Sequence, residues 1–243
     1  MSGHSKWATI KRKKAKVDSQ RGKVFTRISK EIIIAARNGG GDPVGNMRLK
    51  AAIEKAKAAN IPNDNIQRAI QKGVGGGEGA NFEEFSYEGY GPGGVAILLH
   101  VATDNRNRTA GEVRHILSKH GGNLGETGCV GWMFKEQGVI IIDRSETKLS
   151  EDEMMLTALD AGAEDVKVEE DSFEIITEPE EFPTVKAALL EQGVPVADAE
   201  ITMVPQTTVK IVGEEAEKMI KMIDLLEDND DVQAVYTNFE LEE

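Results

Sequence analysis

The chain has 243 residues, of which 40% are apolar and 29% are charged, and its formal net charge is −13 at pH 7. This composition is typical of a globular protein of one to three domains, and its apolar runs are too short to span a bilayer, which takes roughly 20 residues. A single cysteine, Cys129, excludes an internal disulfide framework and no secretory signal peptide is expected, so we expect a cytoplasmic protein without a membrane partner.

The chain begins with a basic block. Residues 1–79 hold 17 Lys and Arg against 6 Asp and Glu, a net charge of +11, whereas residues 80–243 hold 12 against 36, a net charge of −24. Such an asymmetry is expected when one part of a protein binds a polyanion. A solvated lysine-rich surface is the alternative, and we favour nucleic-acid contact because the whole block is basic.

The basic block is predicted to be helical after a tail that is disordered without a partner. Asp18 can cap a first helix over residues 19–37, whose apolar side chains recur at spacings of three and four. The glycines of "NGGGDP" end this helix, and Asp42 can cap a second one over residues 43–59. A third, short helix follows over residues 63–72. Helices this short must bury their apolar stripes against one another or a neighbour.

Five glycines within residues 73–81 predict a flexible hinge and a domain boundary. Beyond the hinge, strands are predicted over residues 85–89, 95–102 and 129–134. A helix that opens with a capping box at Thr109 precedes the last of these strands.

The next stretch, residues 138–204, has the order β-α-β-β-α-β, which is that of a ferredoxin-like sandwich. Its first helix opens with Ser150 and Glu153 at the spacing of a capping box. Residues 207–239 then read β-α-β, so the outer pieces joined together have the same order as the middle one. Two unrelated half-sheets are the alternative, and each would expose an unpaired edge.

We therefore predict an α+β protein in which a basic three-helix domain is followed by two ferredoxin-like βαββαβ domains, one inserted in the other. The helical domain with its tail comprises residues 1–79. A discontinuous ferredoxin-like domain comprises residues 80–134 and 205–243, and the inserted domain comprises residues 135–204.

Most candidate nucleic-acid-binding residues lie near the N-terminus. Cationic side chains neutralise phosphates, and an aromatic ring among them can stack on an unpaired base. Trp7 could equally anchor the tail on the helical block. The candidates of this region are His4, Lys6, Trp7, Lys11, Arg12, Lys13, Lys14, Lys16, Arg21 and Lys23.

A second candidate lies in "TDNRNRTAGEVRHIL". Arg106 and Arg108 lead into a helix N-terminus, where backbone N–H groups and the helix dipole favour an anion. Asp104, Asn105 and Asn107 could equally be turn and cap residues. We include Arg106 and Arg108 as candidates for contact with phosphate or RNA.

No pattern in the sequence points to catalysis, to a metal site or to a cofactor. The four histidines lack a zinc-binding spacing, Cys129 has no basic neighbour in sequence to activate its thiol, and no nucleophile elbow is present. We expect a protein that is not an enzyme. A ligand sensor with a pocket near Arg106 and Arg108, and an adaptor whose acidic faces hold basic proteins, remain as alternatives.

Five stretches of the chain stand out together: "MSGHSKWATIKRKKAKVDSQRGKVFTRISKEI", "GNMRLKAAIEKAKAANIPNDNIQRAI", "YEGYGPGG", "TDNRNRTAGEVRHI" and "GCVGWMF". They closely resemble the YebC/PmpR family, which includes the mitochondrial translational activator of cytochrome oxidase. The resemblance runs from end to end and implies three domains, a basic helical one and two α/β ones. The residues that match the family's basic signature are Lys6, Trp7, Lys11, Lys14, Arg21, Gly22 and Lys23.

The resemblance also implies a function, and it leaves two targets open. Bacterial members are named probable transcriptional regulators that bind DNA, whereas others act on the ribosome as translation factors that relieve stalling at proline-rich stretches. The family implies no catalytic residues. We therefore expect a non-enzymatic, nucleic-acid-binding regulator of gene expression whose partner is DNA or ribosomal RNA, the latter on the ribosome. No oligomeric state follows from the sequence.

Overall fold

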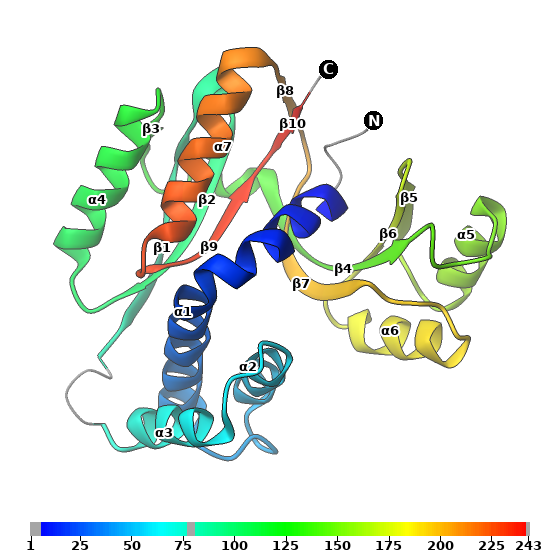
Figure 1. Cartoon of the computed structure of the whole chain (residues 1–243), viewed down its shortest axis with the longest axis horizontal. Helices are drawn as coiled ribbons and strands as arrows, with labels where there is room; N and C mark the ends of the chain where they lie inside the picture. Colours follow the sequence, from blue (N-terminus) through cyan, green and yellow to red (C-terminus); the bar gives the residue numbers. More distant parts are fainter. Residues whose placement is uncertain (1–5, 77–80, 242–243) are drawn as a thin grey trace. The chain divides into compact units, whose positions relative to one another are not determined.

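The computed structural model describes the backbone of residues 6–76 and 81–241, and the side chains of residue 10 and of residues 22–76 and 81–241. The chain divides into two compact units, which are described in turn. The larger unit comprises residues 16–131 and 211–237, and the smaller one comprises residues 1–15, 132–210 and 238–243. The predicted α+β class is confirmed, because three N-terminal helices precede antiparallel sheets (Figure 1).

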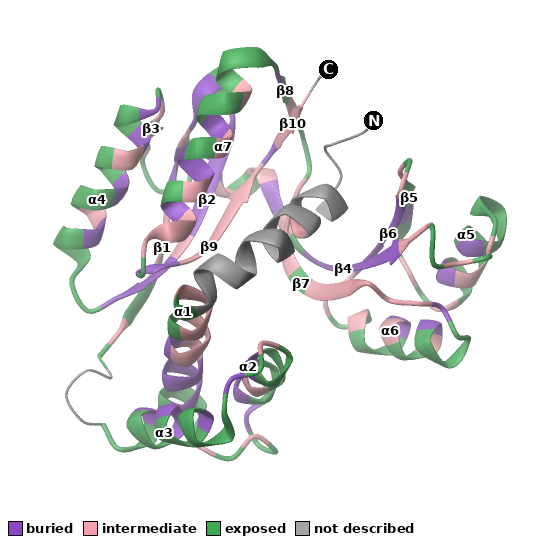
Figure 2. Cartoon of the chain, in the orientation of Figure 1, coloured by how far each residue is buried: buried purple, intermediate pink, exposed green. Residues whose placement is uncertain are grey.

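Three helices open the chain, α1 (Lys6–Gly39), α2 (Met47–Ala58) and α3 (Asn63–Val74). Within the larger unit their apolar side chains form one core, in which Leu49 is fully buried and Ile70 nearly so. Figure 2 shows the buried stretch of α1 where α2 and α3 approach it. The third helix is confirmed within two residues of its predicted end.

The predicted start of the first helix is wrong. Asp18 lies inside α1, which begins at Lys6, so the expectation of a disordered tail is also wrong from Lys6 onward. The physical reason is composition, because residues 6–21 contain neither Gly nor Pro and are rich in Lys, Arg and Ala, which have high helix propensity.

The second helix begins four residues later than predicted, at Met47. Its N-cap is Asn46, whose side-chain oxygen accepts a hydrogen bond from the backbone N–H of Leu49 at 3.0 Å. Asp42 instead accepts a hydrogen bond from the backbone N–H of Val44, as a turn residue does.

The sheet of the larger unit is antiparallel and has the strand order β3-β1-β2-β9. Helices α4 (Arg106–Lys119) and α7 (Gly213–Asp228) lie side by side over one face of it (Figure 1). Its strands are β1 (Glu83–Tyr90), β2 (Ala96–Thr103), β3 (Asn123–Leu124) and β9 (Val232–Thr237). A 3-10 turn, η1 (Pro92–Gly94), joins β1 to β2.

The strand predicted over residues 129–134 is wrong. Residues Gly131–Met133 form a 3-10 turn, η2, and the next strand begins only at Phe134. The cause is Glu88 on β1, whose buried carboxylate accepts three backbone N–H bonds of 2.6 to 2.8 Å. The donors are Gly128, Val130 and Gly131. Because these N–H groups bond to a side chain 40 residues away, they cannot form a strand ladder.

The smaller unit holds the predicted β-α-β-β-α-β order, and its antiparallel sheet has the strand order β5-β6-β4-β7. The predicted capping box of Ser150 and Glu153 is confirmed at the start of α5. The elements are β4 (Phe134–Asp143), α5 (Glu151–Asp160), β5 (Asp165–Val168), β6 (Ser172–Thr177), α6 (Phe182–Glu191) and β7 (Asp198–Pro205). A separate two-stranded sheet pairs β8 (Val209–Ile211) with β10 (Phe239–Leu241).

In chain order, strands β4 to β7 of one sheet fall between strands β3 and β9 of the other. An inserted domain requires this nesting, and the boundaries at residues 134/135 and 204/205 stay a prediction.

In the part of the chain that the structure describes, no helix is both long and apolar enough to cross a membrane.

Candidate nucleic-acid interface

The basic N-terminal candidates are carried by one helix. Of them, His4 lies outside the described residues, whereas the backbone of the others belongs to α1. The side chains of Lys6, Trp7, Lys11, Arg12, Lys13, Lys14, Lys16 and Arg21 also lie outside the described part. What the structure adds for this group is therefore the backbone, which presents them on a helix rather than on a tail.

Lys23 is the one candidate on α1 whose side chain is described, and it is 41% exposed. Its ammonium group lies 3.2 Å from a carboxylate oxygen of Asp228 and donates to the backbone carbonyl of the same residue at 3.1 Å. One helical turn further, Arg27 donates to the backbone carbonyl of Glu227. These contacts attach the middle of α1 to the C-terminal end of α7.

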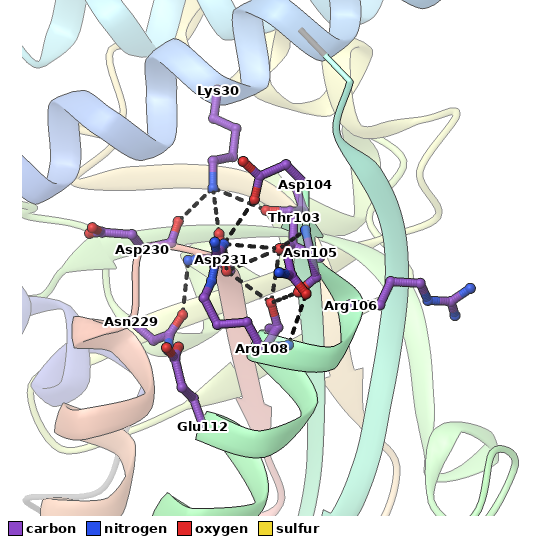
Figure 3. Close-up of polar contacts among 12 residues, drawn as sticks. Lys30, Thr103, Asp104, Asn105, Arg106, Arg108, Glu112, Asn229, Asp230 and Asp231 are labelled. Atoms are coloured by element: carbon purple, nitrogen blue, oxygen red, sulfur yellow. Dashed lines mark hydrogen bonds and ion pairs between the residues drawn. The ribbon is translucent and has the colours of Figure 1, made fainter. Parts of the chain in front are cut away.

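A buried lysine that is not among the sequence-predicted candidates lies on the next turn of α1. Lys30 has a side chain only 8% exposed, and its ammonium group donates to the carbonyls of Ala102 and Asp230 at 3.0 and 2.9 Å (Figure 3). A third bond, of 3.1 Å, reaches the carboxylate of Asp231. The signal in the sequence is the apolar run over residues 32–36. Five consecutive apolar residues cover all sides of a helix, which indicates that the helix is buried there. A lysine beside such a stretch is then buried too and needs a partner for its charge.

Asp231 is the centre of this network. Its second carboxylate oxygen accepts hydrogen bonds from Thr103 at 3.0 Å, from Thr109 at 2.8 Å and from Arg108 at 2.7 Å. Burial acts to raise the pKa of Asp231, but the bonds from Arg108, Thr109 and Lys30 outweigh it and the pKa falls to about 2.

Arg108, a predicted candidate, is part of the network. Its guanidinium group donates to Asp231 and, at 2.9 Å, to Asp104, and these two carboxylates raise its pKa. Its side chain remains 44% exposed. Asn105 is the N-cap of α4 and accepts a hydrogen bond from the backbone N–H of Arg108, so its predicted alternative role as a cap residue is confirmed. The predicted capping box at Thr109 is wrong, because Thr109 lies inside the helix.

Arg106 faces the other way. Figure 3 shows its side chain pointing away from the Asp231 network, and it is 62% exposed. Its guanidinium carbon lies 4.3 Å from the ring centroid of Phe85 on β1, and one nitrogen lies 3.6 Å from the carboxylate of Glu83. Arg106 and Arg108, which are neighbours in the sequence, therefore have different partners: Arg108 is tied to the buried carboxylate of Asp231, whereas Arg106 lies over Phe85 at the surface.

Further exposed cations lie on the short helices α2 and α3, where the apolar faces are turned into the core. They are Lys50, Lys55, Lys57, Arg68 and Lys72. By contrast, Arg48 on α2 is held by two carboxylates, Glu31 at 2.7 Å and Glu84 at 2.5 Å. The described part of the basic block therefore keeps most of its helical lysines at the surface.

A metal site needs several ligands close together, and a reactive thiol needs a lowered pKa. Among them, no cluster of three or more His, Cys, Asp or Glu side chains is placed to hold a metal ion. Burial and the nearby carboxylate of Glu88 raise the pKa of the Cys129 thiol, which disfavours the reactive thiolate.

Comparisons with known proteins match nearly the whole chain. Residues 5–76 match the domain described as "TACO1/YebC protein N-terminal domain", and residues 82–239 match "TACO1/YebC second and third domain".

Individual relatives are similar over their full length. A protein of Desulforamulus reducens, named "Probable transcriptional regulatory protein", is 81% identical over 242 residues, which cover 100% of each chain. A protein of Pelotomaculum thermopropionicum with the same name is 61% identical over 243 residues, again with 100% of each chain covered. The crystal structure of a conserved hypothetical protein from Aquifex aeolicus is 52% identical, has a TM-score of 0.81 and is matched over 94% of both chains.

Proposed function

Because this chain belongs to the TACO1/YebC family, we propose that it is a non-enzymatic regulator of gene expression that binds nucleic acid through its basic N-terminal block. The relatives named as probable transcriptional regulatory proteins support a role in transcription. For that role we propose DNA as the target. The proposal assigns phosphate contact to the cations of α1 up to Lys23 and to those on the exposed faces of α2 and α3.

The observation that carries the proposal is the division of charge. Residues 1–79 have a net charge of +11 in a chain whose total is −13. Binding to phosphates releases condensed counterions, which rewards a dense set of cations and needs no reading of bases. From Lys6 to Lys23, α1 spans roughly 26 Å at 1.5 Å per residue, which is long enough to follow several phosphates.

Ribosomal RNA is the second candidate target, and the charge of the remaining chain favours it. Residues 80–243 have a net charge of −24, so they would be repelled by a duplex along which they lay. A ribosomal surface offers basic proteins beside RNA and relieves that repulsion. In this version the protein is a ribosome-associated translation factor that relieves stalling at proline-rich stretches.

The proposal is tested by removing charge from α1. The variant replaces four neighbouring cations of the helix with glutamine, Lys11, Arg12, Lys13 and Lys14. We expect its affinity for a 20-base-pair DNA and for an RNA hairpin of equal length to fall by about tenfold or more at 0.15 M salt, since each phosphate contact contributes to the salt-dependent term.

The matched control removes the same amount of charge from exposed positions of the acidic part. Its four positions, also changed to glutamine, are Lys119, Lys148, Lys167 and Lys221. Equal losses in the two variants would mean that only net charge matters, and would contradict a phosphate-binding helix. Crosslinking in cells, followed by sequencing of the bound nucleic acid, then separates genomic DNA from ribosomal RNA.

A further inference from the structure

Two aromatic rings stand on one face of the first strand of the larger unit. Phe85 and Tyr87 are two residues apart on β1, so their side chains project to the same face of the strand. Their ring centroids are 5.0 Å apart and the ring planes meet at 85°, an edge-to-face contact. Both side chains are half-buried, so each ring keeps part of its surface in contact with solvent.

Arg106 completes this group from the start of α4. Its guanidinium carbon lies over the ring of Phe85 at 4.3 Å, and the hydroxyl of Tyr87 donates to its backbone carbonyl at 3.4 Å. Arg114, exposed on the same helix, lies near enough that its charge acts to lower the pKa of Tyr87, although burial outweighs it and the pKa is raised. Two aromatic rings therefore lie beside two arginines on the outside of the unit.

The neighbouring edge of the sheet is open at this point. Strand β3 pairs with β1 only at Gly89 and Tyr90, whereas Phe85 and Tyr87 lie beyond that pairing. Among the described strands, none pairs with this side of β1 before Gly89. A ligand can therefore approach the rings and the guanidinium group of Arg106 from the edge of the sheet.

The charges of the site favour a base rather than a run of phosphates. Glu83 lies 3.6 Å from Arg106 and offsets part of its charge, but both side chains are more than 60% exposed, and such a pair contributes little. A flat group that stacks on Arg106 can therefore displace Glu83 at small cost. Aromatic rings and arginine planes stack on unpaired bases without regard to sequence, whereas bases of an intact duplex are not available for stacking.

We propose that Tyr87, Phe85 and Arg106 form a stacking site for an unpaired nucleobase, so that the protein holds single-stranded nucleic acid at the edge of β1 as well as phosphates at α1. This inference rests on the proposed function, because α1 supplies the charge that brings the strand to the protein. It adds a preference for single strands, which phosphate contact alone does not give.

The experiment uses the full chain and a fluorescent 12-nucleotide single strand that carries 2-aminopurine, in RNA and DNA forms, beside a 12-base-pair duplex. Stacking on Tyr87 or Arg106 quenches the fluorescence of 2-aminopurine. We expect Tyr87→Ala and Arg106→Ala to weaken single-strand binding by about tenfold, to restore the fluorescence, and to leave duplex binding within twofold. Comparison of the RNA and DNA strands shows which of them the site prefers.

Two conservative variants and one control separate stacking from folding. Tyr87→Phe keeps the ring and should bind like the unmodified chain, whereas Arg106→Lys keeps the charge but loses the flat group and should retain the weakened binding. Arg144→Ala removes another arginine that lies over a ring, that of Phe173 at 5.1 Å in the smaller unit, and should change neither affinity nor fluorescence.

Unchanged single-strand affinity and quenching in folded Tyr87→Ala would overturn the inference, and so would equal losses for single strand and duplex. The failure of the proposed function looks different. If the glutamine variant of α1 binds every nucleic acid as the unmodified chain does, the proposed function fails, whatever Tyr87→Ala does. If only that variant loses affinity, the proposed function stands and the stacking site fails.

Discussion

At the scale of single residues, Asp231 is a buried carboxylate of the larger unit to which four side chains donate hydrogen bonds. Its carboxylate accepts bonds from α1, β2 and α4 through Lys30, Thr103, Arg108 and Thr109. Two charges at 8% exposure lose most of their hydration, so their attraction is needed to offset that loss. Removing one partner leaves the other charged, buried and less well compensated.

The substitution Lys30→Met tests this arrangement. We expect it to lower the free energy of unfolding by about 3 kcal/mol, because it leaves Asp231 without its buried cation. The control, Lys135→Met, removes a lysine that is 41% exposed beside Glu178 and should destabilise the fold far less than Lys30→Met does. Urea unfolding measures both, and similar values for the two variants would contradict the role given to Lys30.

The pKa of Asp231 gives a prediction on acid stability. It falls from 3.8 to about 2 in the folded protein, so the unfolded chain takes up this proton first as the pH decreases. The carboxylate therefore stabilises the fold above pH 4 and loses that contribution as the pH falls through 2. Between pH 5 and pH 2, the unmodified chain should lose about 2 kcal/mol more stability than Asp231→Asn does. Urea titrations at the two pH values measure the difference, and equal losses in the two proteins would rule this role out.

Glu88 offers a second test at this scale. The substitution Glu88→Gln replaces a carboxylate that accepts three backbone N–H bonds, and we expect a loss of about 2 kcal/mol. Hydrogen exchange of the amides of Gly128, Val130 and Gly131 should accelerate in this variant. The exposed neighbour Glu126→Gln is the control, and faster exchange there to the same degree would show that the loop does not depend on Glu88.

At the scale of secondary-structure elements, α1 is exceptional for its 34 residues and for the glycine in its middle. Gly22 is helical, and a Cβ atom added there meets no other atom within 4 Å. Glycine weakens a helix through its conformational freedom. Gly22 therefore lowers the stability of the basic half of α1, although no packing contact requires a glycine at this position.

We expect Gly22→Ala to stabilise the chain by about 0.5–1 kcal/mol and to raise its helical circular dichroism signal. The matched control is Gly40→Ala just after the helix, where the added Cβ also meets no atom within 4 Å but φ is +86°. That change should destabilise the fold, since only glycine adopts this conformation without strain. Destabilisation by both alanines would show that α1 is not a continuous helix through residue 22.

Elements with local causes were predictable from the sequence. The capping box at Ser150 and the strand and helix order of residues 138–204 follow from local spacing and periodicity, and the structure confirms both. The strand predicted at residues 129–134 is wrong because backbone N–H groups of that loop donate hydrogen bonds to the carboxylate of Glu88, some 40 residues earlier. The apolar run after Lys30 indicates that its charge is paired, but its partner Asp231 is 201 positions away, so no local pattern could identify that partner.

The candidate site divides in the same way. The sequence identifies Arg106 and Arg108 together, but only the structure separates an arginine tied to Asp231 from one that lies over Phe85. Phe85 and Tyr87 carried no motif that set them apart. Their proximity to Arg106 depends on how β1 and α4 pack, which spacing along the chain does not reveal.

At the scale of the whole molecule, the proposed binding depends on the partition of charge along the chain. A basic block of +11 attracts a polyanion while a remainder of −24 is repelled by it, so affinity must arise from few, dense contacts. Such contacts make affinity steeply dependent on salt, whereas binding through apolar or neutral polar contacts depends on salt only weakly.

The dependence of duplex affinity on salt concentration is therefore the most direct measurement. If about six cations contact phosphate, a plot of log affinity against log salt should have a slope near −5. A slope near zero would mean that the positive block does not bind phosphates, and would contradict the account at its base.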